Sequence, residues 1–244
     1  MERFALFHLS AMSNPADDLR CVAVLPAGGT GSRFGGEVPK QFVEVGGREL
    51  ITWALSRFDA SPTVRQIVIA VPAGEMDRAR RIVSSAHWRK PIQLVEGGST
   101  RQESVANALA LAGGTPLVAV HDAVRPLFTE RLLEALLAAA RESGGAIPGR
   151  PLTETIHRVL DGFVVESPRR EEWVAAQTPQ CFRLELLSEC LDRARAEGFV
   201  GTDEASLLVR YGHPVRVIEG EEGNIKVTRP ADMQQVEPLL GAEE

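Results

Sequence analysis

The sequence lacks the features of a membrane, zinc-binding or disulfide-bonded protein. Its 244 residues include only three cysteines, with no C-x-x-C pair, so neither a zinc ribbon nor a disulfide framework is indicated. No apolar run approaches the roughly 20 residues of a transmembrane helix. The apolar patch at residues 4–9 is too brief for a secretory signal. We therefore expect a cytoplasmic protein that does not contact a membrane.

Acidic side chains outnumber basic ones, and lysine is scarce. The 27 basic and 33 acidic residues give a formal net charge of −6, which argues against nucleic-acid binding, because nucleic-acid-binding proteins are normally basic. Only Lys40, Lys90 and Lys226 are lysines. The motifs G-x-S-x-G and H-E-x-x-H are absent. This inventory suits phosphoryl or nucleotidyl transfer, which depends on charge stabilisation, better than covalent catalysis.

Short β-branched runs alternate with longer amphipathic segments along the chain. Strands that are apolar on both faces and separated by helices indicate a mostly parallel sheet with helices on each side. The sequence thus predicts an α/β fold, a single three-layer α/β/α domain with a Rossmann-like nucleotide-binding sheet. Ligands of such sheets bind beyond the carboxyl ends of the strands. The predicted strands are 21–25, 67–71, 92–95, 117–120 and 215–218, and the predicted helices are 49–58, 75–86, 101–112, 129–142, 183–196 and 203–211.

One segment, residues 144–178, interrupts this alternation. Its β-like pieces 155–160 and 163–166 are joined by Asp161-Gly162, a pair typical of hairpin turns. We expect an inserted β-hairpin arm at about 148–178. The arm should pack against a second copy of the chain, because a lone hairpin cannot bury both faces. The rest of the chain divides into a loose N-terminal extension (1–19), the main domain (20–240) and a tail (241–244).

A glycine-rich loop follows the first predicted strand. Five glycines occupy the nine positions from Gly28 to Gly36, so backbone amides there can approach phosphate oxygens closely. Arg33 and Lys40 add two cations, and a flexible strand-to-helix turn is the alternative interpretation. The dinucleotide pattern G-x-G-x-x-G fails at Phe34, which weakens the hypothesis of an NAD-dependent oxidoreductase, and the P-loop pattern fails at Glu37.

A second glycine pair, Gly97-Gly98, follows the third predicted strand. Thr100 and Glu103, a few residues later, have the spacing of a capping box at the start of a helix. Helix capping explains most of this pattern. Alternatively, the first amides of the helix, together with Ser104, bind a polar group of a ligand at the same sheet edge.

The motif His121-Asp122-Ala123-Val124-Arg125-Pro126 follows the fourth predicted strand. Asp122 is placed to contact a hydroxyl group or the shell of a Mg²⁺ ion. Arg125 either serves the same site or forms a structural ion pair with Asp122. We interpret His121 as a core or edge residue, because no second His or Cys lies at metal-binding spacing.

Two motifs occur late in the chain. Residues 202–206 begin a helix with Thr202 as the predicted cap, and residues 224–228 form a predicted short strand. Lys226 lies in this strand. A compact ammonium group serves as a point charge toward a phosphate where a planar guanidinium would not fit. Chance placement of a rare lysine is the other interpretation.

Taken in order, these motifs resemble the 2-C-methyl-D-erythritol 4-phosphate cytidylyltransferases, and the resemblance runs from about Arg20 to Leu240. The residues that carry it are 26–33, 39–42, Gly97-Gly98, Arg101, Ser104, 121–126, 177–180, 202–206 and 224–228. The resemblance implies transfer of a cytidylyl group from CTP to methylerythritol phosphate, a sugar-alcohol phosphate, with release of pyrophosphate. It also implies Mg²⁺ held mainly by the CTP phosphates, with no dedicated metal ligands, and a homodimer formed through the arm.

The resemblance also implies roles for individual positions. The implied catalytic residues are Arg33, Lys40, Arg170 and Lys226. The implied nucleotide-binding residues are Ala27, Gly28, Gly29, Thr30, Gly31, Gly98, Arg101, Ser104 and Ala123. The implied residues for the acceptor substrate are Asp122, Arg125, Thr155 and Thr202.

Two alternatives to this function stay open. Another polyol phosphate, such as ribitol 5-phosphate, is an alternative acceptor, and a CTP-binding module without catalysis is a hypothesis from a different class.

One departure from the family pattern concerns the arm. Arg169 stands where an acidic residue is expected, which leaves open whether Arg169 or Arg170 reaches the acceptor.

Overall fold

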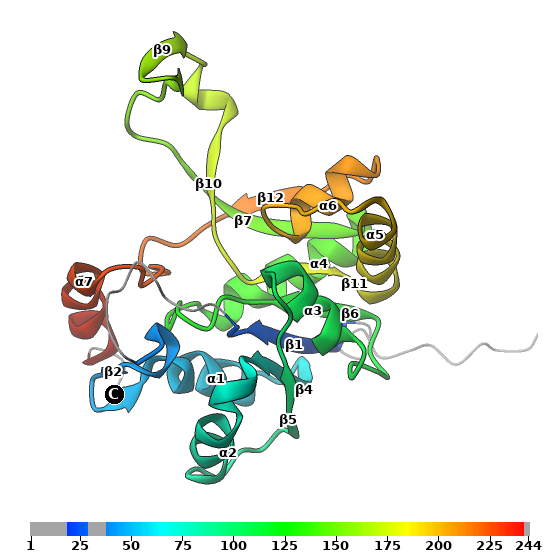
Figure 1. The fold of residues 1–244 in the computed structure, drawn as a ribbon, viewed down its shortest axis with the longest axis vertical. Coiled ribbons are helices and arrows are strands. Elements are labelled where there is room, and N and C mark those ends of the chain that lie inside the picture. Colours follow the sequence, from blue (N-terminus) through cyan, green and yellow to red (C-terminus); the bar gives the residue numbers. More distant parts are fainter. Residues whose placement is uncertain (1–18, 29–37, 242–244) are drawn as a thin grey trace, which may run out of the picture.

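The computed structural model describes residues 19–28 and 38–241. Its main sheet has eight strands in the order β10-β7-β11-β6-β1-β4-β5, with β12 also paired to β7 (Figure 1). Strands β6, β1, β4 and β5 are parallel, whereas β11 runs antiparallel to β6 and β7. The strands are β1 (Cys21–Pro26), β4 (Val64–Val71), β5 (Ile92–Glu96), β6 (Leu117–Val120), β7 (Gly145–Pro151), β10 (Val174–Ala176), β11 (Gln180–Arg183) and β12 (Arg216–Glu219).

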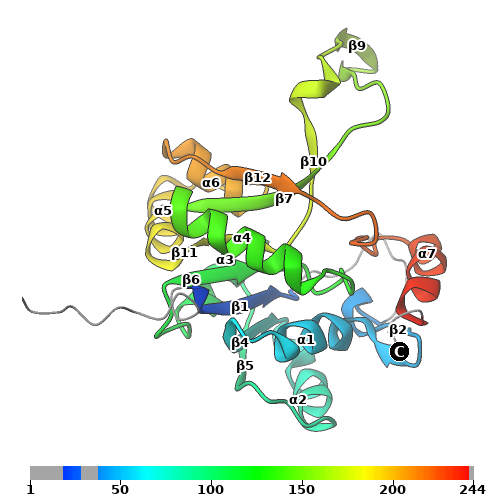
Figure 2. The same cartoon turned by 180° about the vertical axis from the view of Figure 1, so that it is seen from behind.

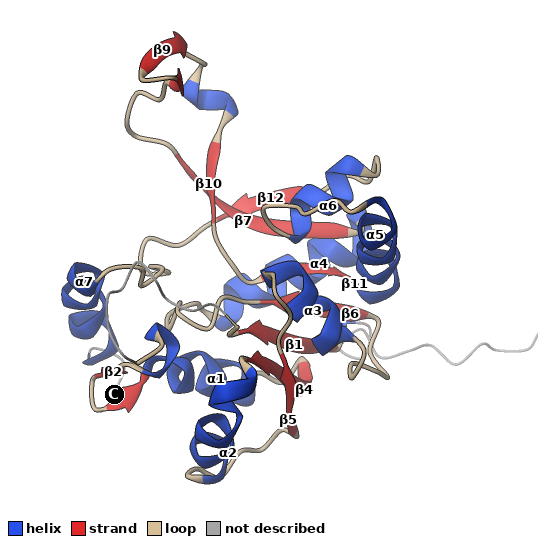
Figure 3. Cartoon of the chain, viewed as in Figure 1, coloured by secondary structure: helices blue, strands red, loops and turns tan. Residues whose placement is uncertain are grey.

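Helices cover both faces of this sheet, as Figure 3 shows. On one face Cys21, Ala23 and Leu25 of β1 pack in a core with α1, α2 and α4. On the other face Val22 and Val24 pack with α3, α5 and α6. Successive side chains of a strand point to opposite faces, so the apolar run of β1 supplies both cores. The helices are α1 (Leu50–Ala60), α2 (Met76–Ser84), α3 (Arg101–Leu109), α4 (Glu130–Ser143), α5 (Leu184–Glu197), α6 (Glu204–Arg210) and α7 (Pro230–Gly241).

A two-stranded arm extends away from this body, as two opposite views show (Figures 1 and 2). It leaves through β7 and returns through β10, and its tip is the hairpin of β8 (Arg158–Leu160) and β9 (Phe163–Glu166). Asp161 and Gly162 join the two strands with φ angles of 50° and 83°. Positive φ at both central residues is the geometry that favours such pairs in tight hairpins. The predicted hairpin and its turn are confirmed.

A third apolar cluster lies beside the sheet and fixes the end of the described chain. Val236 and Leu240 of α7 pack with Trp53 of α1 and with Val45 in the small hairpin of β2 (Glu44–Val45) and β3 (Arg48–Glu49). The indole nitrogen of Trp53 donates to the Val45 carbonyl over 3.0 Å. Val227 belongs to the same cluster, so α7 anchors the segment that carries Lys226.

The three-layer α/β fold is confirmed, with differences in detail. Strands β7, β10 and β11 and helix α7 were not predicted. The predicted strand at 224–228 is wrong, because this segment is a loop that pairs with none of the described strands. The predicted cap Thr202 is also wrong, since the carboxylate of Asp203 accepts the Ser206 amide at the start of α6. The predicted extension and tail lie almost wholly outside the described residues, although Leu19 packs against the first core.

No helix within residues 19–28 and 38–241 combines the length and the apolar character needed to cross a bilayer.

Candidate active site

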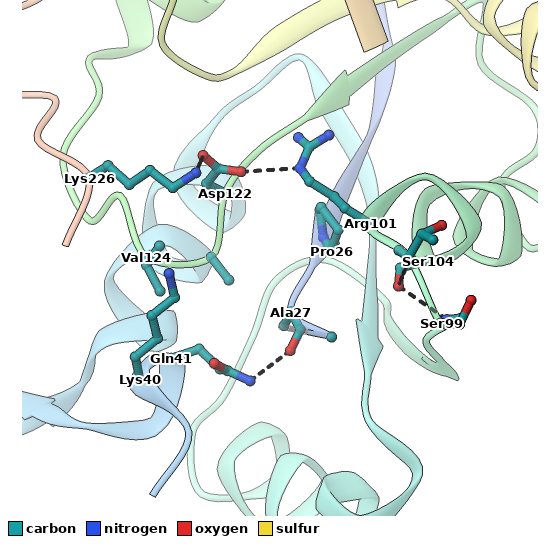
Figure 4. A pocket seen from close by; sticks show the side chains of 14 residues that line it. Pro26, Ala27, Lys40, Gln41, Ser99, Arg101, Ser104, Asp122, Val124 and Lys226 are labelled. Atoms are coloured by element: carbon teal, nitrogen blue, oxygen red, sulfur yellow. Dashed lines mark hydrogen bonds and ion pairs between the residues drawn. The ribbon is translucent and has the colours of Figure 1, made fainter. Parts of the chain in front are cut away.

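A cavity of about 300 Å³ opens beyond the carboxyl ends of β1, β5 and β6 (Figure 4). Three parallel strands end at this edge, and the segment that follows each of them turns into the cavity wall. Three cations and one carboxylate are among the lining side chains, so the charge of the described lining is positive. The lining residues are Pro26, Ala27, Gly28, Lys40, Gln41, Gly98, Ser99, Thr100, Arg101, Ser104, Asp122, Ala123, Val124 and Lys226.

The chain on both sides of the glycine-rich loop is anchored by hydrogen bonds. After β1, the Ala27 amide donates to the Ala70 carbonyl over 2.7 Å. The side-chain amide of Gln41 donates to the Ala27 carbonyl over 2.6 Å, and Gln41 is buried. Lys40 lies next to Gln41, in a short 3-10 helix. Its side chain points toward the cavity in Figure 4. Lys40 is therefore held at the cavity by its neighbour.

The first turn of α3 forms the opposite wall around Ser104. The Ser104 hydroxyl donates to the Thr100 carbonyl over 2.9 Å and accepts the Gly98 amide over 3.1 Å. A Cβ at Gly28 or at Gly97 would lie 3.0 Å from this hydroxyl oxygen. Glycine at these two positions thus lets the loops after β1 and β5 approach each other. Thr100 caps α3 as predicted, by accepting the Glu103 amide over 3.0 Å.

Asp122 is the centre of the charged cluster in this cavity. Its carboxylate lies 2.8 Å from Lys226 Nζ, 3.4 Å from Arg101 Nε and 3.5 Å from Arg125 Nε. Burial alone would raise the pKa of Asp122, but the nearby charges of Arg101, Lys226 and Arg125 outweigh it and hold this pKa well below its usual range. Asp122 is therefore a carboxylate at neutral pH and orients the cations around it.

Lys226 is positioned by the fixed backbone on both sides of it. Arg125 Nη1 donates to the Asn224 carbonyl over 2.7 Å, and the Asn224 side chain donates to the Thr178 carbonyl over 2.7 Å. On the other side the Val227 amide donates to the Val124 carbonyl over 2.9 Å. Arg125 does not line the cavity. Its contacts fit the structural ion pair that was the alternative to a direct role.

Arg101 is held between two carboxylates. Its Nη1 lies 2.5 and 2.7 Å from the two carboxylate oxygens of Glu204, while its Nε faces Asp122. Burial lowers the pKa of Arg101, but the charges of Glu204 and Asp122 raise it above the ordinary value. Sequence reasoning missed the link between Glu204 and this site, since the two partners are 103 residues apart.

His121 belongs to the core, as predicted. It is fully buried, with its ring packed against those of Phe58 and Phe128. Its Nε2 lies 2.8 Å from the Arg125 carbonyl and its Nδ1 lies 3.0 Å from the Thr178 hydroxyl. An acceptor on one side and a hydroxyl on the other fit the neutral ring with its proton on Nε2. Burial lowers the pKa of His121 to about 4.

A family model described as 2-C-methyl-D-erythritol 4-phosphate cytidylyltransferase matches residues 21–242. The chain belongs to this family. A relative of the same description from Symbiobacterium thermophilum is 42% identical over 222 residues, which cover 90% of this chain and 92% of the relative. One from Geobacter metallireducens is 38% identical over 223 residues, covering 89% of this chain and 96% of the relative.

Solved structures of cytidylyltransferases from this family share the fold. The 2-C-methyl-D-erythritol 4-phosphate cytidylyltransferase of Thermus thermophilus is 34% identical, with a TM-score of 0.74, and the match covers 90% of this chain and 98% of that one. A 4-diphosphocytidyl-2C-methyl-D-erythritol synthase from Anaerococcus prevotii is 25% identical, with a TM-score of 0.81 over 94% of this chain and 100% of the other.

In this member of the cytidylyltransferase family, the residues predicted for the site fall into three groups. The cavity brings together Ala27, Gly28, Lys40, Gly98, Arg101, Ser104, Asp122, Ala123 and Lys226. Gly29, Thr30, Gly31 and Arg33 lie outside the described residues. The remaining ones do not line the cavity: Arg125 lies behind it, Thr202 is exposed beside α6, and Thr155 and Arg170 are on the arm.

The arm has a separate shallow hollow, lined by Thr155, Ile156, Pro168, Arg169, Arg170 and Glu171. Arg170 Nη1 donates to the Thr153 carbonyl over 2.7 Å. Arg169 Nε lies 4.0 Å from the carboxylates of both Glu171 and Glu172. Arg170 and Thr155 share this hollow with Arg169, so the hollow does not favour one arginine over the other.

Proposed function

We propose that this chain is a cytoplasmic, Mg²⁺-dependent homodimeric enzyme that transfers a cytidylyl group from CTP to 2-C-methyl-D-erythritol 4-phosphate and releases pyrophosphate. Its membership of the cytidylyltransferase family supports this reaction. The observation that carries the proposal is the cavity beyond β1, β5 and β6. There Arg101 and Lys226 contact Asp122, the single carboxylate of the described lining, and Lys40 lines the same cavity. An excess of fixed cations in a concave site favours polyanionic ligands.

The chemistry requires alignment of two anions more than it requires a base. A phosphate monoester with a second pKa near 6 is about −1.5 to −2 charged at pH 7. A phosphate oxygen of the acceptor attacks the α-phosphorus of CTP, a new P–O bond forms, and the bond to pyrophosphate breaks. Lys40 and Lys226 face the cavity where charge accumulates on the α-phosphate oxygens. Fixed cations aimed at developing charge lower the barrier without reorganising.

The nucleotide half of the cavity is formed by the loops after β1 and β5. In the proposed complex the amides following Ala27 hold the CTP phosphates, with Arg33 stabilising the transferred group. Gly98, Arg101 and Ser104 lie around the cytosine, although the Ser104 hydroxyl already bonds the Gly98 amide and the Thr100 carbonyl. Ser104 therefore acts chiefly by shaping the loop that contacts the base.

The donor set at the cavity fits Mg²⁺ held mainly by CTP. Asp122 is the one carboxylate among the described lining residues, and residues 19–28 and 38–241 contain no group of three or more His, Cys, Asp or Glu side chains suited to a metal. Proteins commonly bind Mg²⁺ through one or two carboxylates plus substrate phosphates and water. When bound, the ion neutralises charge on the CTP phosphates. Asp122 is the residue that would hold it.

The arm supports the proposed homodimer. Val159, Leu160 and Phe163 at its tip are 58%, 57% and 74% exposed, and an exposed apolar cluster usually marks an interaction site. Thr155 and Arg170 do not reach the cavity of their own chain. We assign them to the acceptor pocket of the second subunit, which the arm would complete. The cytoplasmic location agrees with the three cysteines, all free and buried.

Pyrophosphate release tests the reaction directly. The purified protein is given CTP and Mg²⁺ with methylerythritol phosphate or ribitol 5-phosphate at equal concentration. We expect release with the first acceptor, a much slower rate with the second, and none when either CTP or the acceptor is left out. Preference for ribitol 5-phosphate would contradict the proposed acceptor, and CTP binding without turnover with either would contradict catalysis.

A further inference from the structure

Glu204 is a buried carboxylate that the reaction described above does not use. It is the first residue of α6 and is only 1% exposed. It does not line the cavity. An ionised carboxylate at such a position is costly unless it is paired. Its partner is Arg101, whose Nη1 lies 2.5 and 2.7 Å from the two carboxylate oxygens.

This pair limits where the Arg101 guanidinium can point. Arg101 begins α3 and lines the cavity, with Nη1 on Glu204 and Nε 3.4 Å from Asp122 Oδ1. A guanidinium is a planar fork that prefers bidentate contact with a carboxylate. Without Glu204, the fork is free to turn fully onto Asp122 and to compete with Lys226, which lies 2.8 Å from Asp122 Oδ2.

A second set of contacts ties the same two elements together without Glu204. The side chain of Gln102 donates to the Phe199 carbonyl over 3.1 Å and accepts the Gly201 amide over 2.9 Å. The start of α3 is therefore attached to the segment before α6 even when the ion pair is removed. Loss of Glu204 should change the orientation of one side chain and leave the two elements in place.

We propose that Glu204 is a positioning residue for the nucleotide: it fixes the Arg101 guanidinium at the cavity wall and acts on CTP only through Arg101. The inference rests on the proposed function, because it takes CTP as the ligand of this cavity. Glu204 contacts neither the substrate nor the reacting atoms. Its contribution is geometric: the Glu204 carboxylate, at the start of α6, holds the Arg101 guanidinium of α3 in one orientation.

Two conservative variants separate position from charge. E204Q removes the charge and keeps the shape, whereas E204D keeps the charge and shortens the side chain by one methylene. Coupling between contacting residues is large enough for a tenfold effect, which corresponds to about 1.4 kcal/mol. We expect both variants to weaken CTP binding about tenfold in calorimetry and to raise the KM for CTP by a similar factor, with kcat within about threefold.

A charge-only role of Glu204 predicts a different pattern. Removing one negative charge near the cavity would strengthen CTP binding in E204Q, and E204D would bind like the wild type. Either result would overturn the proposal. The matched control is E130Q. Glu130 is a partly buried acid that accepts a hydrogen bond from the Ser61 hydroxyl over 2.8 Å, and it does not line the cavity. This variant should bind CTP like the wild type.

A double-mutant cycle tests whether Glu204 acts through Arg101. In an R101M background, E204Q should leave the CTP dissociation constant unchanged, whereas independent effects would add. Additivity overturns the proposal. Circular dichroism and thermal unfolding establish that each variant is folded, and R101M/E204Q remains informative if E204Q alone is unstable. If the wild type itself does not bind CTP, the proposed function fails, whereas wild-type binding with an unaffected E204Q refutes only the role of Glu204.

Discussion

At the scale of single residues, the site depends on where a few side-chain charges are held. Lys40 and Lys226 reach one cavity from segments far apart in sequence, and each has a fixed neighbour: Gln41 for Lys40 and Asn224 for Lys226. The scarcity of lysine made both visible in the sequence. The sequence did not identify Gln41 and Asn224 as anchors, because it does not show whether the side chain of an Asn or Gln is buried or exposed to solvent.

Lys40→Ala should reduce turnover more than it weakens CTP binding. In the proposed complex Lys40 is a point charge aimed at the α-phosphate. Such a charge contributes most when charge develops in the transition state, so we expect kcat to fall on the order of 10²-fold. The KM for CTP should change much less. Steady-state kinetics of pyrophosphate release measure both. Lys90→Ala is the matched control, since Lys90 is the third lysine and does not line the cavity; a loss there of similar size would contradict a specific role for Lys40.

His121 should make the folded protein less stable in acid. Burial lowers its pKa to about 4 from an ordinary value of 6.5, so the unfolded chain binds one more proton between these values. The free energy of unfolding therefore falls as pH falls through this window, by about 3 kcal/mol in total. Asp122 contributes little above about pH 5, because its lowered pKa affects stability only as pH approaches and falls below its ordinary value of 3.8.

His121→Gln provides the comparison, since an amide can donate to the Arg125 carbonyl and accept from the Thr178 hydroxyl without titrating. Urea unfolding at several pH values between about 4.5 and 7 gives the free energy for both proteins. The wild type should lose stability relative to the variant as pH falls. Parallel curves would show that His121 does not carry this pH dependence.

At the scale of helices and strands, local patterns predicted the elements whose apolar residues repeat regularly. The predicted helices match α1 to α6 within a few residues, because each has one apolar face. Strand β7 was not recognisable, since its seven residues include two glycines and two prolines. It is a strand only because β11, β12 and β10 pair with it. The opposite error is the predicted strand at 224–228. Individual hydrogen bonds hold this segment, and it pairs with none of the described strands.

The turn before α3 should not tolerate a side chain at Gly98. A Cβ there would lie 2.2 Å from the Cβ of Glu103 in the first turn of the helix, so the loop or the helix start must move. Gly98→Ala should therefore raise the KM for CTP about tenfold or more while the fold survives. Gly113→Ala is the control, because a Cβ at Gly113 meets nothing within 4 Å. Equal kinetics for the two variants would show that the turn has no role in nucleotide binding.

At the scale of the whole molecule, the predicted site residues divide between the body and the arm. Sequence order alone did not reveal this division, because the distance between Arg170 and the cavity depends on the direction in which the arm leaves the sheet (Figures 1 and 2). The link between Arg101 and Glu204 was hidden for the same reason, since tertiary packing joins positions 103 residues apart. Resemblance to a family identified most of these positions, and the fold shows which of them meet within one chain.

Combining two impaired variants in one dimer tests whether one subunit's arm completes the other's site. Lys40→Ala disables the cavity and leaves the arm intact, whereas Arg170→Ala alters the arm and leaves the cavity intact. In a heterodimer, one site combines the intact cavity of the Arg170→Ala chain with the intact arm of the Lys40→Ala chain. Co-expression with two different affinity tags isolates this species, and we expect it to recover up to about half of wild-type turnover per dimer if the two sites act independently.

The control for this experiment is a heterodimer in which both changes are in the same chain and the other chain is wild type. If each arm serves the opposite subunit, one site of this control dimer carries Lys40→Ala and the other receives the Arg170→Ala arm. Turnover should then stay near that of the two single-variant homodimers. If each arm serves its own cavity, the outcomes reverse: this heterodimer keeps one intact site and the first keeps none. The same scheme with Arg169→Ala in place of Arg170→Ala identifies which arginine acts. Only for the residue that reaches the acceptor should turnover depend on whether the two changes are in the same chain or in different chains.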